Sequence, residues 1–327
     1  MSLPTLGIDL AKTKFDVALF QDEQFHHHVF PNTPLGITAL LAWLPAHGGA
    51  QVHACLEATG TYGDAVARQL HDAGHVVSIV NPAVLKAFRQ STLTRTKNDR
   101  TDAQLLARYA ALHHPKAWVP PSPELRELQA LARRLESLLQ LRQQESNRLA
   151  SAERSPLVAE SIQIMLTALD QEIARVEQLL KDHIQQHPDL KAQHDLLRSI
   201  PGIGDKTATT LLAECGDVAG FTDARALAAF AGLTPKQHQS GTSVHAKPRL
   251  SKVGSDRLRK ALYFPAINAC RFNPVVKAFA DRLLARGKPK MAVIGAAMRK
   301  LLHLAYGVLK SGKPFDPNHG QLAPIAP

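Results

Sequence analysis

The fold is decided by residues 5–30, which read TLGIDLAKTKFDVALFQDEQFHHHVF. Apolar residues recur with a period near two, and this pattern predicts strands at Thr5–Asp9, Lys14–Phe20 and Gln24–Phe30. Short polar breaks separate the three runs. We therefore expect a three-stranded meander at the start of the chain.

Helices and strands alternate after this meander. The pattern predicts helices at Pro34–Leu44 and Thr61–Ala73 and strands at Gln51–Leu56 and Val76–Val80. Strands that alternate with helices are typical of an α/β sheet flanked by helices. We assign this sheet to a first domain, residues 1–120.

Helical patterns dominate from Pro123 onward. Ser155-Pro156 interrupts a first helix, and a second then repeats apolar residues in steps of four and three: Ile162, Leu166, Leu169, Ile173, Val176 and Leu180. This 3.5-residue period predicts an antiparallel coiled-coil hairpin at residues 121–188. Two amphipathic helices packed on a globular core are the alternative.

Residues 189–327 form a third, mainly helical domain, so the fold class is α/β plus α. Helices are expected near Lys206–Glu214, Ala224–Ala231, Asp256–Cys270, Val275–Arg286 and Met291–Lys310. An irregular polar segment is expected from Thr234 to Gly254.

Composition favours a nucleic-acid partner. Of 327 residues, 39 are Lys or Arg and 28 are Asp or Glu, so the net charge of +11 attracts polyanions. No apolar run reaches the roughly 20 residues that a membrane span needs, and no signal-peptide pattern opens the chain, so we expect a cytoplasmic protein without a membrane partner. The three cysteines lack zinc-site spacing and are expected to be reduced and mostly buried.

Four acids have positions that suit a metal site. Asp9 ends the first strand and Glu57 directly follows another, whereas Asp99 and Asp102 share a helix face at i and i+3. Two carboxylates about 4 Å apart repel by roughly 4 kcal/mol at an effective dielectric of 20. Magnesium, which prefers oxygen ligands, would offset this repulsion, and two ions would suit phosphoryl transfer.

Each acid also has a structural explanation. Asp99 could cap its helix with Asp102 as an acidic first-turn companion, and Asp9 could form a turn. Taken together, the four acids follow the order that an RNase H-like nuclease uses.

The chain resembles a known family. GIDLAK, EATGTY, NPAxxKAF and KNDRTDA resemble the RuvC-like, RNase H-like N-terminal domain of the DEDD transposases, a bacterial insertion-sequence family. SIPGIG, AFAGLTP and QSGTS resemble that family's C-terminal transposase domain. The resemblance covers nearly the whole chain.

The resemblance implies a recombinase that excises and inserts its element. Asp9, Glu57, Asp99 and Asp102 match the family's metal-binding acids, and Ser240 matches its nucleophilic serine, which forms a covalent phosphoserine intermediate. It further implies a structured noncoding guide RNA that pairs with donor and target DNA, and a homo-oligomer, dimer or tetramer, in which different subunits supply acids and serine.

The residues around Ser240 support a weaker argument of their own. Residues 236–260 hold seven Lys or Arg and one acid, a net charge of +6. A serine beside a phosphate in such surroundings is placed to attack phosphorus if a base or metal takes its proton. Thr242, Ser243 and Ser251 are alternative nucleophiles, and a plain loop serine is the structural explanation.

Two basic segments are candidate nucleic-acid contacts. Residues 196–206 resemble a helix-hairpin-helix element, in which Gly202 and Gly204 would let the backbone approach a phosphate and Lys206 would add charge; a tight turn between packed helices is the alternative. The densest basic patch would also bind phosphates, unless it is merely a solvated charge run: Lys236, Lys247, Arg249, Lys252, Arg257, Arg259 and Lys260.

His26, His27 and His28 are expected to lie on an exposed strand, with the middle ring pointing away from its neighbours.

Three functions compete at this point. A serine-using transposase accounts for both the acids and the QSGTS segment. A RuvC-like endonuclease that hydrolyses junctions would form no covalent protein–DNA species. A binding scaffold without catalysis gives no reason for four acids.

Overall fold

The computed structural model of the chain describes residues 3–58, 60, 62–92, 98–151, 155–240 and 244–318, with the backbone alone at 237–240 and 244–248. The chain divides into two compact units, Met1–Pro120 and Pro121–Pro327.

The first unit is built on a five-stranded sheet in the order β3-β2-β1-β4-β5. β1 pairs antiparallel with β2 and parallel with β4, β2 pairs antiparallel with β3, and β4 pairs parallel with β5. The predicted meander is therefore confirmed. The strands are β1 (Thr5–Leu10), β2 (Lys14–Gln21), β3 (Gln24–Pro31), β4 (His53–Glu57) and β5 (Val76–Val80).

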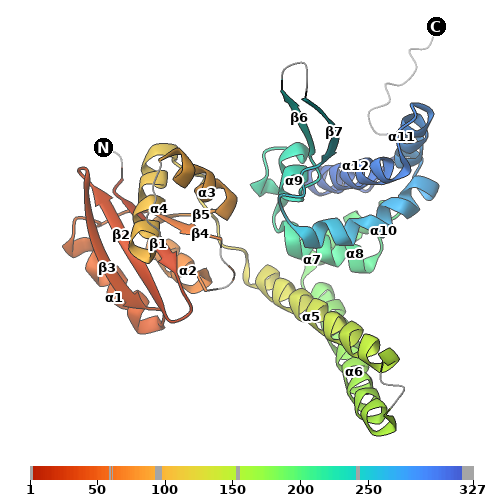
Figure 1. Ribbon diagram of the computed structural model, residues 1–327, viewed down its shortest axis with the longest axis horizontal. Helices are drawn as coiled ribbons and strands as arrows, with labels where there is room; N and C mark the ends of the chain where they lie inside the picture. Colours follow the sequence, from red (N-terminus) through yellow and green to blue (C-terminus); the bar gives the residue numbers. More distant parts are fainter. Residues whose placement is uncertain are drawn as a thin grey trace. The chain divides into compact units, whose positions relative to one another are not determined.

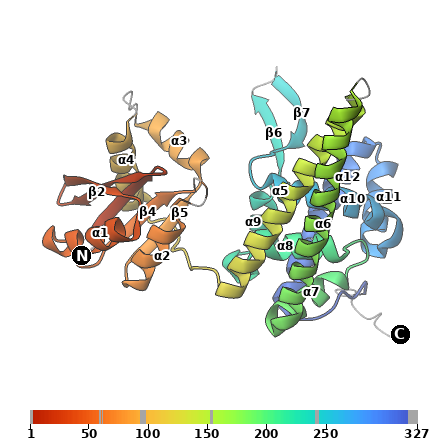
Figure 2. The same cartoon turned by 90° about the horizontal axis from the view of Figure 1, so that it is seen from below.

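Helices cover both faces of this sheet (Figures 1 and 2). Leu6, Ile8 and the other apolar residues of one face pack against α1 (Pro34–Ala46) and α2 (Asp64–Asp72). Cys55 and Val80 on the opposite face pack against α3 (Pro82–Ser91) and α4 (Asp99–His113). Because side chains alternate along a strand, Gly7 and Asp9 lie on the α3–α4 face.

The start of α4 is fixed by Asn98. Its side-chain oxygen accepts a hydrogen bond from the Thr101 N–H at 2.8 Å, and the Thr101 hydroxyl accepts one from the Asn98 N–H at 3.1 Å. This capping box makes Asn98 the N-cap, so the alternative role of Asp99 as a cap is wrong. Asp99 and Asp102 both lie in the first turn, on the same helix.

The second unit begins with two long helices, α5 (Pro123–Ser151) and α6 (Pro156–Gln186), which pack side by side. The four-three spacing predicted for α6 matches its buried residues, which are Leu166, Leu169, Ile173, Val176, Leu180 and Ile184. Most of these join the core cluster of the whole unit. A separate hairpin domain at 121–188 and a helical domain at 189–327 stay predictions.

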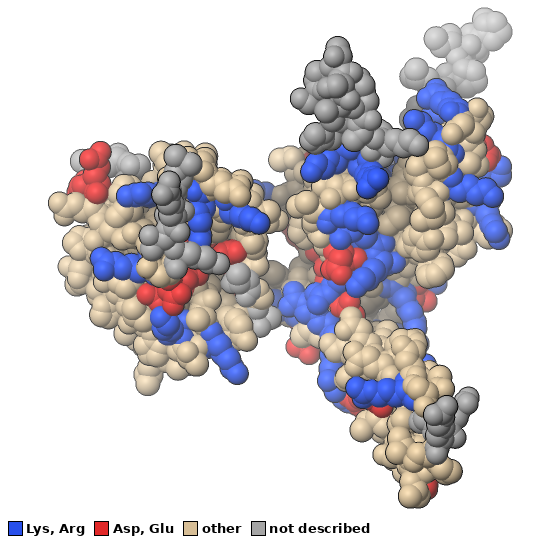
Figure 3. Space-filling model, viewed as in Figure 1, with Lys and Arg blue, Asp and Glu red and all other residues tan. Residues whose placement is uncertain are grey.

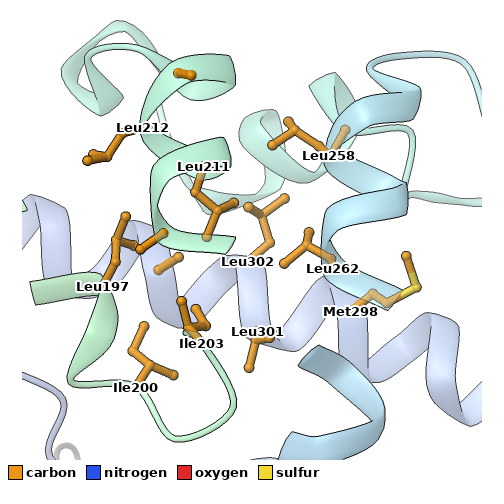
Figure 4. Packing of buried hydrophobic residues seen from close by; sticks show 14 of the residues in the cluster. Leu197, Ile200, Ile203, Leu211, Leu212, Leu258, Leu262, Met298, Leu301 and Leu302 are labelled. Atoms are coloured by element: carbon orange, nitrogen blue, oxygen red, sulfur yellow. The ribbon is translucent and has the colours of Figure 1, made fainter. Parts of the chain in front are cut away.

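The remaining helices pack around a common core (Figure 4). Leu211 and Leu212 reach this core from α8, Leu258 and Leu262 from α10, and Leu301 from α12. The helices are α7 (Pro188–Arg198), α8 (Asp205–Cys215), α9 (Ala224–Phe230), α10 (Asp256–Phe272), α11 (Pro274–Ala285) and α12 (Lys290–Ser311), with a short 3-10 turn at Val218–Gly220.

The segment expected to be irregular contains regular structure. β6 (Pro235–Ser240) and β7 (Val244–Leu250) form a two-stranded antiparallel sheet, with Ser240 opposite Val244. Pro235 and Pro248 hide this hairpin from sequence patterns, but a two-stranded ribbon has free edges at which proline is tolerated. The prediction of an irregular segment is therefore wrong for these two strands.

α12 is long and apolar enough to span a membrane by length and composition. Val293, Ala297, Leu301 and Leu302, however, lie in the core of the second unit. We assign α12 to that core.

Candidate functional site

The strands bring three acids to one face of the sheet. Asp9 pairs with Asp16 across the antiparallel β1–β2 ladder. In the parallel β1–β4 pair, Ile8 lies opposite Leu56, so Asp9 and Glu57 occupy the next position on neighbouring strands. Leu6, Ile8 and Leu56 point into the α1–α2 core, and the alternating acids therefore point to the α3–α4 face.

Gly7 lets α4 approach this face closely. A Cβ atom at Gly7 would lie 1.9 Å from the Ala103 carbonyl oxygen and 2.5 Å from the Ala107 nitrogen. The Thr5 hydroxyl also donates a hydrogen bond to the Ala107 carbonyl at 2.9 Å. The helix thus lies directly on β1, and its first turn carries Asp99 and Asp102 to the end of the strand where Asp9 lies.

The acids influence one another electrostatically. The pKa of Asp9 is raised from 3.8 to about 6, first by burial and then by the negative charges of Asp102, Asp99, Glu57 and Asp16. The other three predicted acids therefore all lie within electrostatic reach of Asp9. Figure 3 shows acidic atoms gathered on one face of the first unit, with Lys and Arg atoms around them.

Carboxylates can influence one another's charge at distances too long for them to bind the same metal ion. Within the described residues, no group of three or more His, Cys, Asp or Glu side chains already has metal-cluster spacing. The two findings differ because charges act over several ångströms, whereas magnesium binds its ligands at about 2 Å. Asp99 and Asp102 are each turned toward a protein cation instead.

Two cations neutralise part of the acidic charge. Lys14 Nζ lies 2.8 Å from Asp99 Oδ2 and 3.1 Å from Asp16 Oδ2. Arg89 Nη2 lies 2.6 Å from Asp102 Oδ1. The hydrogen bond to Asp99 is the main cause that raises the pKa of Lys14, and the hydrogen bond from Lys14 is the main cause that lowers the pKa of Asp99.

Asp16 holds Lys14 through an ion pair. This carboxylate is buried and is also 3.0 Å from His27 Nε2. The expected alternation of the three histidines is confirmed. His27 points to Asp16, whereas His26 contacts His47, the C-cap of α1, and His28 contacts Trp43 on α1. Sequence reasoning missed Lys14, Asp16 and Arg89, although the period of two places Asp16 across from Asp9.

Ser240 belongs to the second unit. It is the last residue of β6, and its backbone lies at the end of the hairpin where 241–243 connect the strands. Its side chain, like that of Lys247, lies outside the described residues, as do the alternatives Thr242 and Ser243. The acids of the first unit and the serine of the second therefore come from separate units.

The base of the hairpin is held by Arg259. Its Nη1 donates hydrogen bonds to the carbonyls of Ala231, Gly254 and Ser255 at 3.0, 3.0 and 3.1 Å. A Cβ atom at Gly254, where φ is +135°, would lie 2.2 Å from the Phe230 carbonyl oxygen, so only glycine fits. These contacts fix where β6 and β7 leave the helical core.

Two residues of the predicted basic patch therefore have internal partners. Arg257 contacts Glu136 at 2.6 Å and Glu214 at 3.4 Å, and Arg259 binds backbone carbonyls as described. These contacts give both side chains a structural role, and their contact with phosphate stays a prediction. Lys236, Arg249, Lys252 and Lys260 are exposed.

The turn at residues 201–204 has one glycine for packing and one with open space. A Cβ atom at Gly202, where φ is +105°, would lie 2.9 Å from the Ala269 Cβ of α10. Gly204 begins α8, and nothing lies within 4 Å of the corresponding position there. Lys206 forms an exposed ion pair with Glu177 at 2.7 Å. Gly202 therefore serves helix packing, and Gly204 leaves room for a ligand.

The cysteines are free, as expected. Burial raises the pKa of the Cys55 and Cys215 thiols to about 12, so neither is a nucleophile at neutral pH.

Comparison with known proteins identifies two family matches. Residues 194–281 match the model described as "Transposase IS116/IS110/IS902 family", and residues 6–152 match the IS110-type DEDD model described as "Transposase". The first covers the helical core and the β6–β7 hairpin, and the second covers all four acids.

Relatives match over most of the chain. A "Pilin gene-inverting protein" of Moraxella bovis is 36% identical over 97% of this chain and 98% of its own length. A "Probable family 20 transposase" of Pseudomonas aeruginosa is 26% identical, over 88% of each chain. A "Transposase for insertion sequence element IS1328" of Yersinia enterocolitica is 26% identical over 79% of this chain and 81% of its own length.

Proposed function

Because the chain belongs to the IS116/IS110/IS902 family of DEDD transposases, and is thus a DNA transposase or recombinase, we propose a mechanism with two parts. Asp9, Glu57, Asp99 and Asp102 hold divalent metal beside the scissile phosphate. Ser240 attacks phosphorus and retains one DNA end covalently. The observation that carries the first part is that the charges of the other three predicted acids, Asp102, Asp99 and Glu57, all act on the partly buried Asp9.

The sheet supports an RNase H-like, RuvC-like assignment for the first unit. An antiparallel meander followed by two parallel strands places Asp9 on the central strand and Glu57 on its parallel neighbour. The buried 3.5-residue pattern of α6 supports a coiled-coil hairpin in the second unit.

The acidic residues fit a divalent metal. Family membership implies dependence on such a metal, and four carboxylates are the hard oxygen donors that Mg²⁺ prefers. Burial and, after it, the neighbouring negative charges raise the pKa of Asp9, and a bound cation would offset the charge. We propose two Mg²⁺ ions, which when bound supply Lewis-acid activation of the phosphate and stabilise the attacking and leaving oxygens.

The chain's own residues prepare this site. Asp16 and Asp99 hold the Lys14 ammonium between them, and Arg89 orients Asp102. These contacts keep two flexible first-turn acids close to Asp9 without metal. Replacement of either cation should therefore disturb the position of an acid rather than remove a metal ligand.

Ser240 supplies the second part of the mechanism. The Oγ–phosphorus bond forms as the bond from phosphorus to one deoxyribose oxygen breaks, the serine proton passes to a base, and the leaving oxygen gains a proton. The phosphoester bond is exchanged rather than hydrolysed, so its energy is retained for rejoining. The position of Ser240 at the end of a hairpin, with exposed Lys236 and Arg249 on the same two strands, supports this role.

Several partners follow as proposals. The substrate is DNA, donor and target, and we expect the protein to act in the cytoplasm. A structured noncoding RNA selects the DNA, and a homo-oligomer, dimer or tetramer, joins the acids of one subunit to the serine of another. RNA that co-purifies with the protein and matches sequence beside its gene would support the RNA proposal, and protein free of a specific RNA would refute it.

The experiment is a strand-transfer assay on end-labelled DNA that flanks the gene. Ser240→Ala and Asp102→Asn should each abolish both strand cleavage and the protease-sensitive, covalent protein–DNA species, because the serine bond forms as the strand breaks. Mg²⁺-dependent cleavage without any adduct in wild-type protein would favour the alternative, a RuvC-like endonuclease. Full strand transfer by Ser240→Ala would refute the nucleophile.

A further inference from the structure

The outer side of α10 exposes large apolar side chains to solvent. Its inner side is anchored by Leu258, Leu262, Ala266 and Ala269, all fully buried (Figure 4). Its outer side presents five exposed residues at helical spacing, here called the α10 face: Lys260, Phe264, Asn268, Arg271 and Phe272.

Two phenylalanines dominate this face. Phe264 and Phe272 are each 72% exposed, and the ring of Phe264 packs only edge-on against Tyr263, with ring centroids 5.2 Å apart. Single exposed apolar residues are common, but two protruding rings on one 17-residue helix leave substantial apolar area in water. A binding partner that covers the rings would relieve this exposure.

The charges around the rings are positive. Residues 282–315 contain eight Lys or Arg and no Asp or Glu. Arg286, Lys288 and Lys290 are exposed at the turn into α12, and the Tyr263 hydroxyl beside Phe264 lies 4.0 Å from Met291 Sδ at the same turn. Tyr263, whose ring packs against that of Phe264, therefore reaches this cationic turn.

The acids near this surface are already paired. Asp256 lies 3.0 Å from Lys260, and Asp281 of α11 lies 2.6 Å from Lys277. Exposed aromatic rings beside exposed cations such as Arg271, Arg286 and Lys288 are the combination that binds unpaired nucleic acid, since the rings stack on bases while Arg and Lys contact the backbone. A second protein surface would instead need matching apolar or acidic groups.

We propose that the α10 face and the 286–290 turn bind an unpaired nucleic-acid strand. The proposal rests on the nucleic-acid substrate of the proposed function but concerns a surface apart from the acids and Ser240. Eight residues of helix separate the two rings by about 12 Å along the axis. Stacked nucleotides advance by about 3.4 Å, so the rings would contact bases three or four nucleotides apart.

The test compares the affinity of the full-length protein for labelled dT15, U15 and a 15-base-pair duplex by fluorescence anisotropy without divalent metal. Phe264→Ala/Phe272→Ala should weaken single-strand binding at least about fivefold per ring and leave duplex binding within about twofold. Phe264→Trp/Phe272→Trp should retain the affinity for single strands, because tryptophan also stacks on bases. Ile164→Ala/Met165→Ala, which truncates two exposed apolar side chains on α6, is the matched control and should not change it.

Two further measurements separate the remaining outcomes. Arg271→Gln should lower the slope of log affinity against log salt by about 0.7 for a single strand. Preference for U15 or dT15 would identify RNA or DNA as the source of the strand. The proposal is overturned if the double alanine variant binds single strands like wild type, or if it changes the oligomeric state by light scattering, since a second copy then covers the face. Ser240→Ala should bind normally, so failure of the catalytic proposal remains distinguishable.

Discussion

Replacement of Asp9 by asparagine should stabilise the first unit at neutral pH when divalent metal is removed. The pKa of Asp9 rises from 3.8 in the unfolded chain to about 6 in the fold. Between these values the folded state binds the extra proton, so the free energy of unfolding falls as pH rises through this window. Asparagine carries no charge, so the variant does not lose this free energy of unfolding as the pH rises.

The size of the effect follows from the same shift. A rise from 3.8 to about 6 corresponds to about 3 kcal/mol above pH 6, because one pKa unit is worth about 1.4 kcal/mol. Asp9 is only partly buried, so solvent screening makes this an upper value, and we expect about 1–3 kcal/mol at pH 7.5.

Urea unfolding in EDTA, followed by tryptophan fluorescence, measures this difference. Both tryptophans of the chain, Trp43 and Trp118, lie in the first unit and report its unfolding. The advantage of Asp9→Asn should shrink as pH falls toward 4, and Mg²⁺ should stabilise wild type more than the variant. Asp72→Asn, at an exposed acid on α2, is the control. Asp9→Asn that is no more stable than wild type at pH 7.5 would refute the reasoning.

Three further predictions concern the scaffold. Gly7→Ala should destabilise the first unit by about 1–3 kcal/mol or more, because its Cβ would lie 1.9 Å from the Ala103 oxygen; unfolding in urea measures it, and an unchanged midpoint would contradict the close α4–β1 contact. Arg259→Leu should lower the free energy of unfolding of the second unit by about 1–3 kcal/mol, because it leaves the carbonyls at the hairpin base without a donor. It should also reduce formation of the covalent protein–DNA adduct. Thermal unfolding measures the first effect and the adduct assay the second. Arg142→Ala should leave the midpoint of thermal unfolding almost unchanged, because the ion pair of Arg142 with Asp170 is solvent-exposed; a clear drop in the midpoint would show that the pair fixes the α5–α6 hairpin.

Local patterns were sufficient to predict most elements of the fold. The period of two identified β1, β2 and β3, and the apolar spacing of α6 identified its buried face, because each pattern reports one local surface. α3 was missed, although Asn81 caps it and Pro82 begins it, because its ten residues form fewer than three turns and bury only Leu85. The β6–β7 hairpin was missed because proline masks both of its strands.

The site was predicted only in part. The order of the four acids along the chain was visible, but their proximity depends on the bare Cα of Gly7, which admits α4, and on the β1–β4 register. Gly7 lies two residues before Asp9, but its partners Ala103 and Ala107 are distant in sequence, so local patterns do not show this contact. The internal contacts of Arg257 and Arg259 likewise depend on partners distant in sequence, such as Glu136 and Ala231, so charge density alone could not reveal these contacts.

The most direct test of the metal site is a titration with Mn²⁺ in which electron paramagnetic resonance measures the free ion, since Mn²⁺ takes the same oxygen ligands as Mg²⁺. Wild type and Asp72→Asn should bind Mn²⁺ with the same affinity. Affinity should fall at least about tenfold in each of the four acidic variants, Asp9→Asn, Glu57→Gln, Asp99→Asn and Asp102→Asn, because loss of even an outer-shell partner often costs that much. Equal Mn²⁺ affinity in wild type and all four acidic variants would contradict the account.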